Sequence, residues 1–179
     1  MKKETKKQLL IGAALVLELL FLLLYLNGRI DRLLDSDMSS EMILGQLLAR
    51  NNGILSDQWY YSTELRVLNT QLIYALFFRL SSNWHFVRMA STLVLWCVLI
   101  ASYGVLCRVM GCKKSFGVTA LLLAAPVSES YFRFVLAGVY YVPHLAIAFA
   151  ALALNEVYFK AQTDRKKFWL VVSVLLALV

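Results

Sequence analysis

The chain carries an almost unbroken apolar run near its start, LLIGAALVLELLFLLLYL at residues 9–26, which limits the folds that it can adopt. Residues 8–26 contain one ionisable side chain, Glu18. At about 1.5 Å of rise per residue, a helix of this length crosses a hydrocarbon core of about 30 Å. The run is longer than the apolar part of a signal peptide, and no A-x-A-like cleavage site follows it. It therefore predicts a transmembrane anchor that is not cleaved.

Further apolar stretches repeat the same pattern along the chain. Apolar residues make up 60% of it and the mean hydropathy is +0.67, which is outside the usual range of soluble domains. Pro143 fits the first turn of one of the expected helices. The sequence thus predicts an all-α, polytopic transmembrane helix bundle, with spans after the anchor at about 84–107, 110–126, 135–158 and, incompletely, 168–179. Because the last run is too short to cross a bilayer, we expect a truncated chain, or one completed by further transmembrane helices of the same or another chain.

The lysines indicate the orientation of these spans. All nine fall in three clusters, at residues 2–7, 113–114 and 160–167, whereas residues 27–83 contain five arginines, six acids and no lysine. By the positive-inside rule the lysine clusters are cytoplasmic, including the basic N-terminus at 1–7. Residues 27–83 and the link at 127–134 are then extracytoplasmic. We expect a multi-pass cell-membrane protein in contact with lipid. The net charge of +7 follows from this bias, so it does not indicate nucleic-acid binding.

The 27–83 segment has the pattern of two amphipathic helices lying at the membrane surface. The first starts at Asp37, carries Met42, Ile43, Leu47 and Leu48 on an apolar side, and stops at an Asn-Asn-Gly sequence. The second starts at Ser62-Thr63-Glu64 and continues through LRVLNTQLIYALFFRL.

Acidic residues are crowded at the start of this segment, where Asp31, Asp35, Asp37 and Glu41 fall within eleven residues. The simplest interpretation is structural: Asp37 caps the first helix and Glu41 complements its positive end. However, Asp37 and Glu41 share a helix face, and their repulsion costs stability unless a cation, proton or substrate relieves it.

A second polar cluster, SESYFR at 128–133, lies on the same predicted side and adds Glu129 and Arg133. Carboxylates and arginines at one membrane face can form a phosphate site, with or without a divalent metal ion.

Several motifs in order carry a resemblance to a known class. The anchor is followed by DSDMSSEMILGQLLARNNG, then NTQLIYALFFRL, FVRMASTLVLW, TALLLAAP and SESYFR. Over about residues 8–160 this order resembles the amino-terminal part of the GT-C class of integral-membrane glycosyltransferases, which includes protein mannosyltransferases and lipid A aminoarabinose transferases. The chain departs from the class at Asn69-Thr70, where a proline is common, and supplies fewer spans than such enzymes have.

The resemblance implies transfer of a sugar from a polyprenyl-phosphate carrier to an extracytoplasmic acceptor. Asp37 would be the general base, and Asp35 its partner or a metal ligand. Glu129 would be a second metal ligand and is also grouped with the substrate-binding residues. Arg88 and Arg133 would hold the lipid phosphate, although Arg88 could instead snorkel at the end of its span. We group Glu41 with the substrate-binding residues, chiefly as a helix-terminal charge.

Two other interpretations stay open. One is a small non-enzymatic polytopic membrane protein, such as a transporter or flippase subunit, which would place polar residues inside its spans rather than outside them. The other is an inactive, truncated glycosyltransferase.

Overall fold

The computed structural model describes residues 3–61, 69–160 and 168–172. Within these ranges all regular secondary structure is helical, which confirms the predicted all-α class. The helices are α1 (Lys3–Asn27), the 3₁₀ helix η1 (Ile30–Leu33), α2 (Ser36–Asn51), α3 (Thr70–Phe78), α4 (Trp84–Val109), α5 (Lys113–Ala124), the one-turn α6 (Glu129–Tyr131), the π-helix η2 (Phe132–Ala137) and α7 (Val142–Lys160).

Three of the described helices are long and apolar enough to cross a membrane: α1 over Thr5–Asn27, α4 and α7. Helix α7 begins at Val142, so Pro143 lies in its first turn as expected. The lack of a backbone N–H in Pro143 removes no hydrogen bond there, because the first N–H groups of a helix have no intrahelical acceptor. Of the expected last run, residues 168–172 are helical and residues 173–179 lie outside the described residues.

The segment expected as one straight span at 110–126 differs from that prediction. Gly111 adopts φ +77°, a left-handed conformation that interrupts the helix, and α5 begins only at Lys113. Helix α5 is therefore 12 residues long, too short to cross alone. It forms a pair with Glu129–Ala137 that is bent by 89°. Counting this broken pair as one crossing raises the number of candidate spans in the described ranges from three to four.

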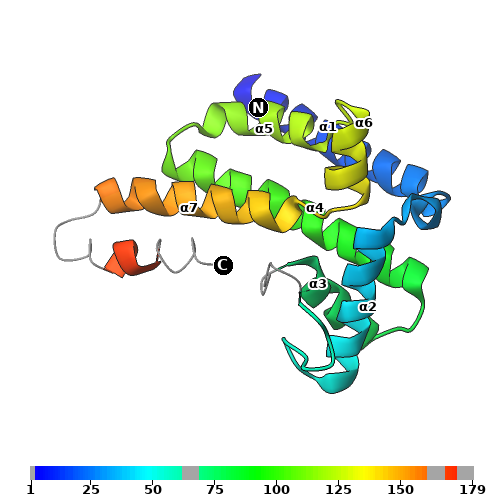
Figure 1. Ribbon diagram of the computed structural model, residues 1–179. Coiled ribbons are helices and arrows are strands. Elements are labelled where there is room, and N and C mark those ends of the chain that lie inside the picture. The colour runs from blue at the N-terminus through cyan, green and yellow to red at the C-terminus, as the bar shows by residue number, and fades with distance from the viewer. Residues whose placement is uncertain (1–2, 62–68, 161–167, 173–179) are drawn as a thin grey trace.

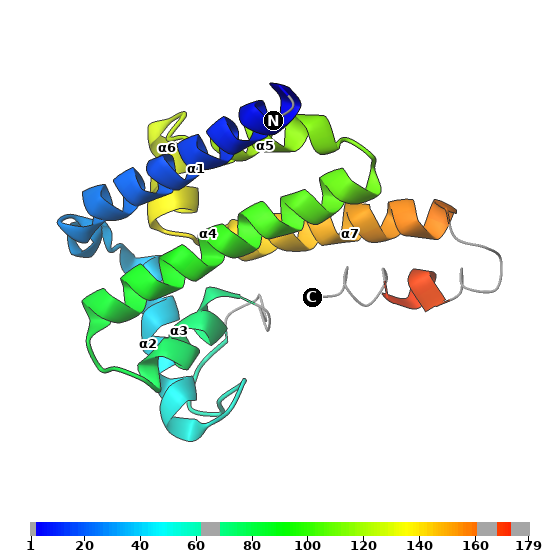
Figure 2. The same cartoon turned by 180° about the vertical axis from the view of Figure 1, so that it is seen from behind.

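The apolar helices form two layers, which Figures 1 and 2 show from opposite sides. Helix α7 lies along α4, and Lys160 Nζ donates a hydrogen bond to the Val109 carbonyl over 2.8 Å, so their C-terminal ends meet. Helix α1 lies beside α5, where the side chain of Ile11 takes the space that Gly117 leaves open. Helices α2 and α3 pack together at the N-terminal end of α4.

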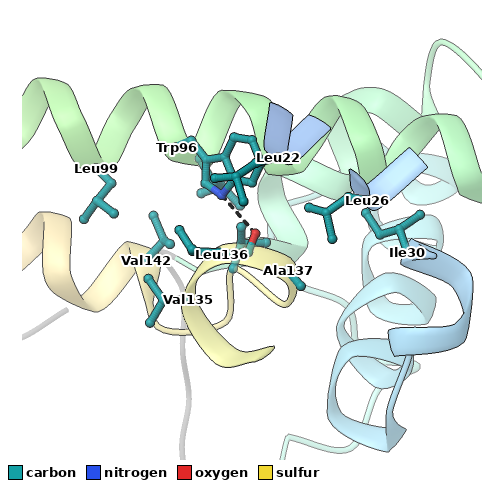
Figure 3. Close-up of a cluster of buried hydrophobic side chains, with 11 residues drawn as sticks. Leu22, Leu26, Ile30, Trp96, Leu99, Val135, Leu136, Ala137 and Val142 are labelled. Carbon is teal, nitrogen blue, oxygen red and sulfur yellow. Dashed lines mark hydrogen bonds between the residues drawn. The ribbon is translucent and has the colours of Figure 1, made fainter. Parts of the chain in front are cut away.

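The main apolar cluster joins the C-terminal part of α1 to α4 and η2 (Figure 3). Its largest member, Trp96, is 1% exposed and donates its indole N–H to the Leu136 carbonyl at 2.9 Å. Lipid tails are as apolar as leucine, so burial alone does not specify how helices dock in a bilayer. The fit between the packed side chains and the hydrogen bond from Trp96 hold η2 against α4.

Helices α2 and α3 occupy the expected loop, but their ends are set differently from the prediction. Helix α2 ends at Asn51 and is followed by Asn52 at φ +50°, which agrees with the predicted Asn-Asn-Gly stop. The predicted start of the second helix at 62–64 lies outside the described residues. Asn69 is extended, so α3 begins at Thr70. That these helices lie amphipathically on a membrane surface stays a prediction, because their buried side chains face each other and α4.

Candidate functional site

The start of α2 meets the segment between α5 and α7 at a small pocket of about 30 Å³. Six residues line it, three from each segment: Asp35, Asp37 and Met38 on one side, and Phe134, Tyr140 and Tyr141 on the other. The start of α2 was predicted to be extracytoplasmic, as was Phe134 at the end of the link 127–134, whereas Tyr140 and Tyr141 fall in the stretch predicted as the next span. The acidic sequence therefore faces these three aromatic residues and not the charged residues of SESYFR.

The capping residue of α2 is Asp35, and the sequence-based assignment of the cap to Asp37 is wrong. Asp35 has extended backbone angles (φ −104°, ψ −178°), and its Oδ1 accepts a hydrogen bond from the Met38 N–H at 2.9 Å. The Ser39 hydroxyl donates to the Asp35 carbonyl at 2.6 Å and reinforces this turn. One carboxylate oxygen of Asp35 is thus used for structure.

Asp37 lies in the first turn of α2 with an exposed side chain. It forms no hydrogen bond or ion pair with any residue in the described ranges. The positive end of the helix dipole favours a negative charge there. Asp37 is consequently the carboxylate of this pocket that is available to another molecule.

The aromatic side of the pocket packs closely against α2 at Gly138. A Cβ atom added there would overlap the methyl group of Met38, which can move aside, and would lie 2.5 Å from the Arg133 carbonyl oxygen, a backbone contact within η2 that favours glycine. The next residue, Val139, is fully buried and has φ +51°. A β-branched side chain rarely adopts this conformation, which costs of order 1–3 kcal/mol. The packing around Val139 must supply that energy, and it fixes the direction in which Tyr140 and Tyr141 leave η2.

Glu41 lies away from the pocket and connects α2 to α3. Its carboxylate accepts hydrogen bonds from Thr70 Oγ1 at 3.0 Å and from Asn69 Nδ2 at 3.4 Å. Thr70 and Asn69 are almost completely buried. Glu41 therefore places its charge at the N-terminus of α3, and not at the end of its own helix as expected.

Arg88 is one of the most buried side chains described, at 2% exposure. Its guanidinium group donates to the carbonyl oxygens of Ile30 and Leu33, the latter at 3.3 Å, and approaches the Met38 sulfur at 3.2 Å. The structure thus uses Arg88 to hold η1 against α4, behind the pocket. It neither snorkels nor faces an open phosphate site.

Glu129 and Arg133 are exposed, and neither lines the pocket. Of the two, only Arg133 is adjacent in the chain to a lining residue, Phe134. The expected convergence of Glu129 with Asp35 is not observed.

The pocket does not bring together the two suggested metal ligands, Asp35 and Glu129. Asp35 is engaged as a cap, and Glu129 is not part of the pocket. No three His, Cys, Asp or Glu side chains in the described ranges lie close enough together to hold a metal ion.

Sequence reasoning missed two features of this region. Asp31 Oδ2 lies 2.8 Å from His85 Nδ1, and Asn27 Oδ1 lies 3.2 Å from His85 Nε2, which ties the end of α1 to the start of α4. The other is the aromatic side of the pocket. The tyrosine pair after Gly138 was the available signal, but nothing local indicates that it meets α2.

Comparison with known proteins gives no relationship for this chain: no protein-family description, curated protein or solved structure matches it.

Proposed function

We propose that this chain belongs to a GT-C-type glycosyltransferase that moves a sugar from a polyprenyl-phosphate carrier to an extracytoplasmic acceptor. One observation carries the proposal: Asp37 is an exposed carboxylate without a partner among the described residues, in a pocket whose other side is aromatic. A general base must be free to reach the proton that it removes. Aromatic side chains line most small-molecule sites and present the flat surfaces against which a sugar ring can pack.

In the proposed step the Asp37 carboxylate takes the proton of an acceptor hydroxyl group. At the same time the oxygen of that hydroxyl group forms a bond to the anomeric carbon of the donor sugar. The bond from that carbon to the phosphate oxygen breaks, and polyprenyl phosphate leaves with the electron pair. Arg133 supplies the cation for this phosphate, since the guanidinium of Arg88 is already bound to backbone carbonyls. Asp35 contributes by fixing the first turn of α2, and hence the position of Asp37.

The volume of the pocket is about 30 Å³, which is room for about one water molecule. A sugar therefore requires the aromatic side to move away from α2. The turn at Gly138 and Val139 is where the structure stores backbone strain, which makes it the expected position of that movement.

The test uses the protein in its native membranes and a panel of polyprenyl-phosphate sugars. Asp37→Asn keeps the size of the side chain and removes the base, so transfer should fall about 10²-fold or more while the membrane level stays unchanged. Asp57→Asn is the matched control, because Asp57 is an exposed carboxylate of the same predicted outer segment that does not line the pocket. Full transfer activity in Asp37→Asn would remove the catalytic role. Absence of transfer by the unaltered protein with every donor would favour the non-enzymatic alternatives.

A further inference from the structure

A hollow with a basic lining lies at the opposite end of α4 from the acidic pocket. Its volume is about 310 Å³, at the lower end of the roughly 300–1,000 Å³ of ligand pockets. It opens between the last turns of α4 and the start of α5, and is lined by Gly104, Cys107, Arg108, Lys113 and Phe116. Arg88 and Arg108 are twenty residues apart on one helix, which corresponds to about 30 Å. The two sites are therefore on different sides of a membrane that α4 crosses.

The lining combines two cations with no acid. Arg108 is in the last turn of α4 and Lys113 is the first residue of α5, and both are exposed. Neither forms an ion pair with another residue in the described ranges; the acid described near this end, Glu156, is paired with Lys160 at 2.8 Å. Arg108 and Lys113 have no acidic partner among the described residues, and two such cations beside one hollow repel each other, so an anion that binds both is favoured.

The shape of the hollow follows from small and aromatic residues. A Cβ atom on Gly104 would come within 3.2 Å of the Phe116 ring, so glycine lets this ring lie against α4. The Phe116 ring in turn stacks on Tyr103, with centroids 6.1 Å apart. These contacts hold α5 beside α4 and keep Arg108 and Lys113 on the same hollow.

The two helices that form the hollow also carry exposed apolar side chains. Val105 of α4, the residue after Gly104, is 54% exposed, and Val118 and Leu122, on a different face of α5 from Lys113, are 50% and 58% exposed. On helices of a membrane protein these side chains face lipid tails. A ligand that places an anionic group in the hollow and extends hydrocarbon chains along the apolar helices has the chemistry of a phospholipid.

We propose that Arg108 and Lys113 form a binding site for the phosphate of an anionic phospholipid in the leaflet next to the lysine-rich ends of the spans. Arg108 offers the planar fork that binds two phosphate oxygens, and Lys113 adds a point charge. By the positive-inside rule this leaflet is the cytoplasmic one, where anionic lipids attract basic residues. The proposal is independent of the glycosyltransferase assignment, which concerns the other side of the membrane.

The experiment measures lipid binding by the purified full chain in detergent, by native mass spectrometry and by the shift in thermal unfolding. Phosphatidylglycerol should bind and raise the unfolding midpoint, and phosphatidylcholine of the same chain length should not. Arg108→Gln and Lys113→Gln should each weaken phosphatidylglycerol binding about tenfold, the effect of losing one charged hydrogen bond. Arg108→Lys should retain part of the binding, because it keeps the charge and loses the fork.

Lys114→Gln is the matched control, since Lys114 is the neighbouring exposed lysine and does not line the hollow. It should change binding less than about threefold, and circular dichroism should show that all variants keep their helices. An equal loss in Lys114→Gln would reduce the effect to general charge and overturn the site. Equal binding of phosphatidylcholine would also overturn it. Inorganic phosphate that binds as tightly as the lipid would overturn the assignment to a lipid headgroup.

Discussion

Asp35 and Asp37 are two residues apart, yet their side chains have different surroundings. The carboxylate of Asp35 accepts the Met38 N–H and ends the extended segment before α2, whereas that of Asp37 is exposed beside the pocket. Both satisfy the local preference for an acid at a helix start, so the sequence pattern alone allowed either to be the cap. The difference matters because one residue keeps the helix in place and the other is available for chemistry.

The capping role of Asp35 predicts a specific order of stabilities. Asp35→Ala should lower the free energy of unfolding by about 1 kcal/mol, because the Met38 N–H loses its acceptor, whereas Asp35→Asn should be nearly neutral. Unfolding in mixed detergent, followed by circular dichroism, measures both. If Asp35→Asn were as unstable as Asp35→Ala, the carboxylate charge rather than the cap would be the stabilising feature.

Arg88 provides a second prediction at this scale. Arg88→Met removes the donors for the Ile30 and Leu33 carbonyls, so stability should fall by about 1–3 kcal/mol. Arg133→Met is the control, since Arg133 is exposed and is expected to change stability by no more than about 0.5 kcal/mol. The same unfolding assay measures the stability of both variants. A stable Arg88→Met protein with a selective defect in sugar transfer would instead support direct phosphate binding by Arg88.

At the level of elements, the pair α2–α3 depends on a close approach at one glycine. A Cβ atom on Gly45 would lie 2.6 Å from Tyr74 Cβ and 3.0 Å from the Gln71 carbonyl oxygen. The two helices are then joined by Glu41, which binds Thr70. Because Met42 and Tyr74 pack with Val87 of α4, this pair also forms the surface on which the α4 end rests.

Gly45→Ala should therefore separate α2 from α3 and lower the free energy of unfolding by about 1–3 kcal/mol. Gly12→Ala is a matched control in another helix, where an added methyl group meets nothing within 4 Å. There the better helix propensity of alanine should leave stability unchanged or raise it by up to about 1 kcal/mol. Equal effects of the two substitutions would show that helix propensity, and not the α2–α3 contact, governs Gly45.

For the whole molecule, the arrangement of helices agrees with a two-sided protein. The hydrogen bond from Lys160 to the Val109 carbonyl brings the ends of α7 and α4 together, and α5 starts nearby at Lys113. The lysine-bearing ends of α1, α5 and α7 thus lie toward one end of the molecule, while α2, α3 and η1 occupy the other (Figures 1 and 2). Which end faces the cytoplasm is a prediction from the positive-inside rule.

That orientation can be measured by labelling intact cells with a membrane-impermeant thiol reagent. In a background without Cys97, Cys107 and Cys112, a cysteine at Asn52 should react from outside, and one at Lys113 should react only after permeabilisation. Both positions are exposed, so access depends on the side of the membrane and not on burial. Labelling at Lys113 from outside would invert the topology and place the acidic pocket in the cytoplasm.

The helical class, the main apolar helices and the ends of α2 and α7 that carry capping signals can all be predicted from the sequence. These follow from hydropathy, charge bias and local signals such as Asn52 after α2 and Pro143 in α7, which act within a few residues. The hydrogen-bond and packing partners of individual side chains could not be predicted in this way, because they depend on how the helices pack. Arg88 reaches Ile30 across 58 positions, and the start of α2 meets the tyrosines that follow Gly138. Many partners of equal local chemistry were available to each of these groups. Helix packing selects among them, because it fixes which backbone carbonyls and side chains come within hydrogen-bonding distance.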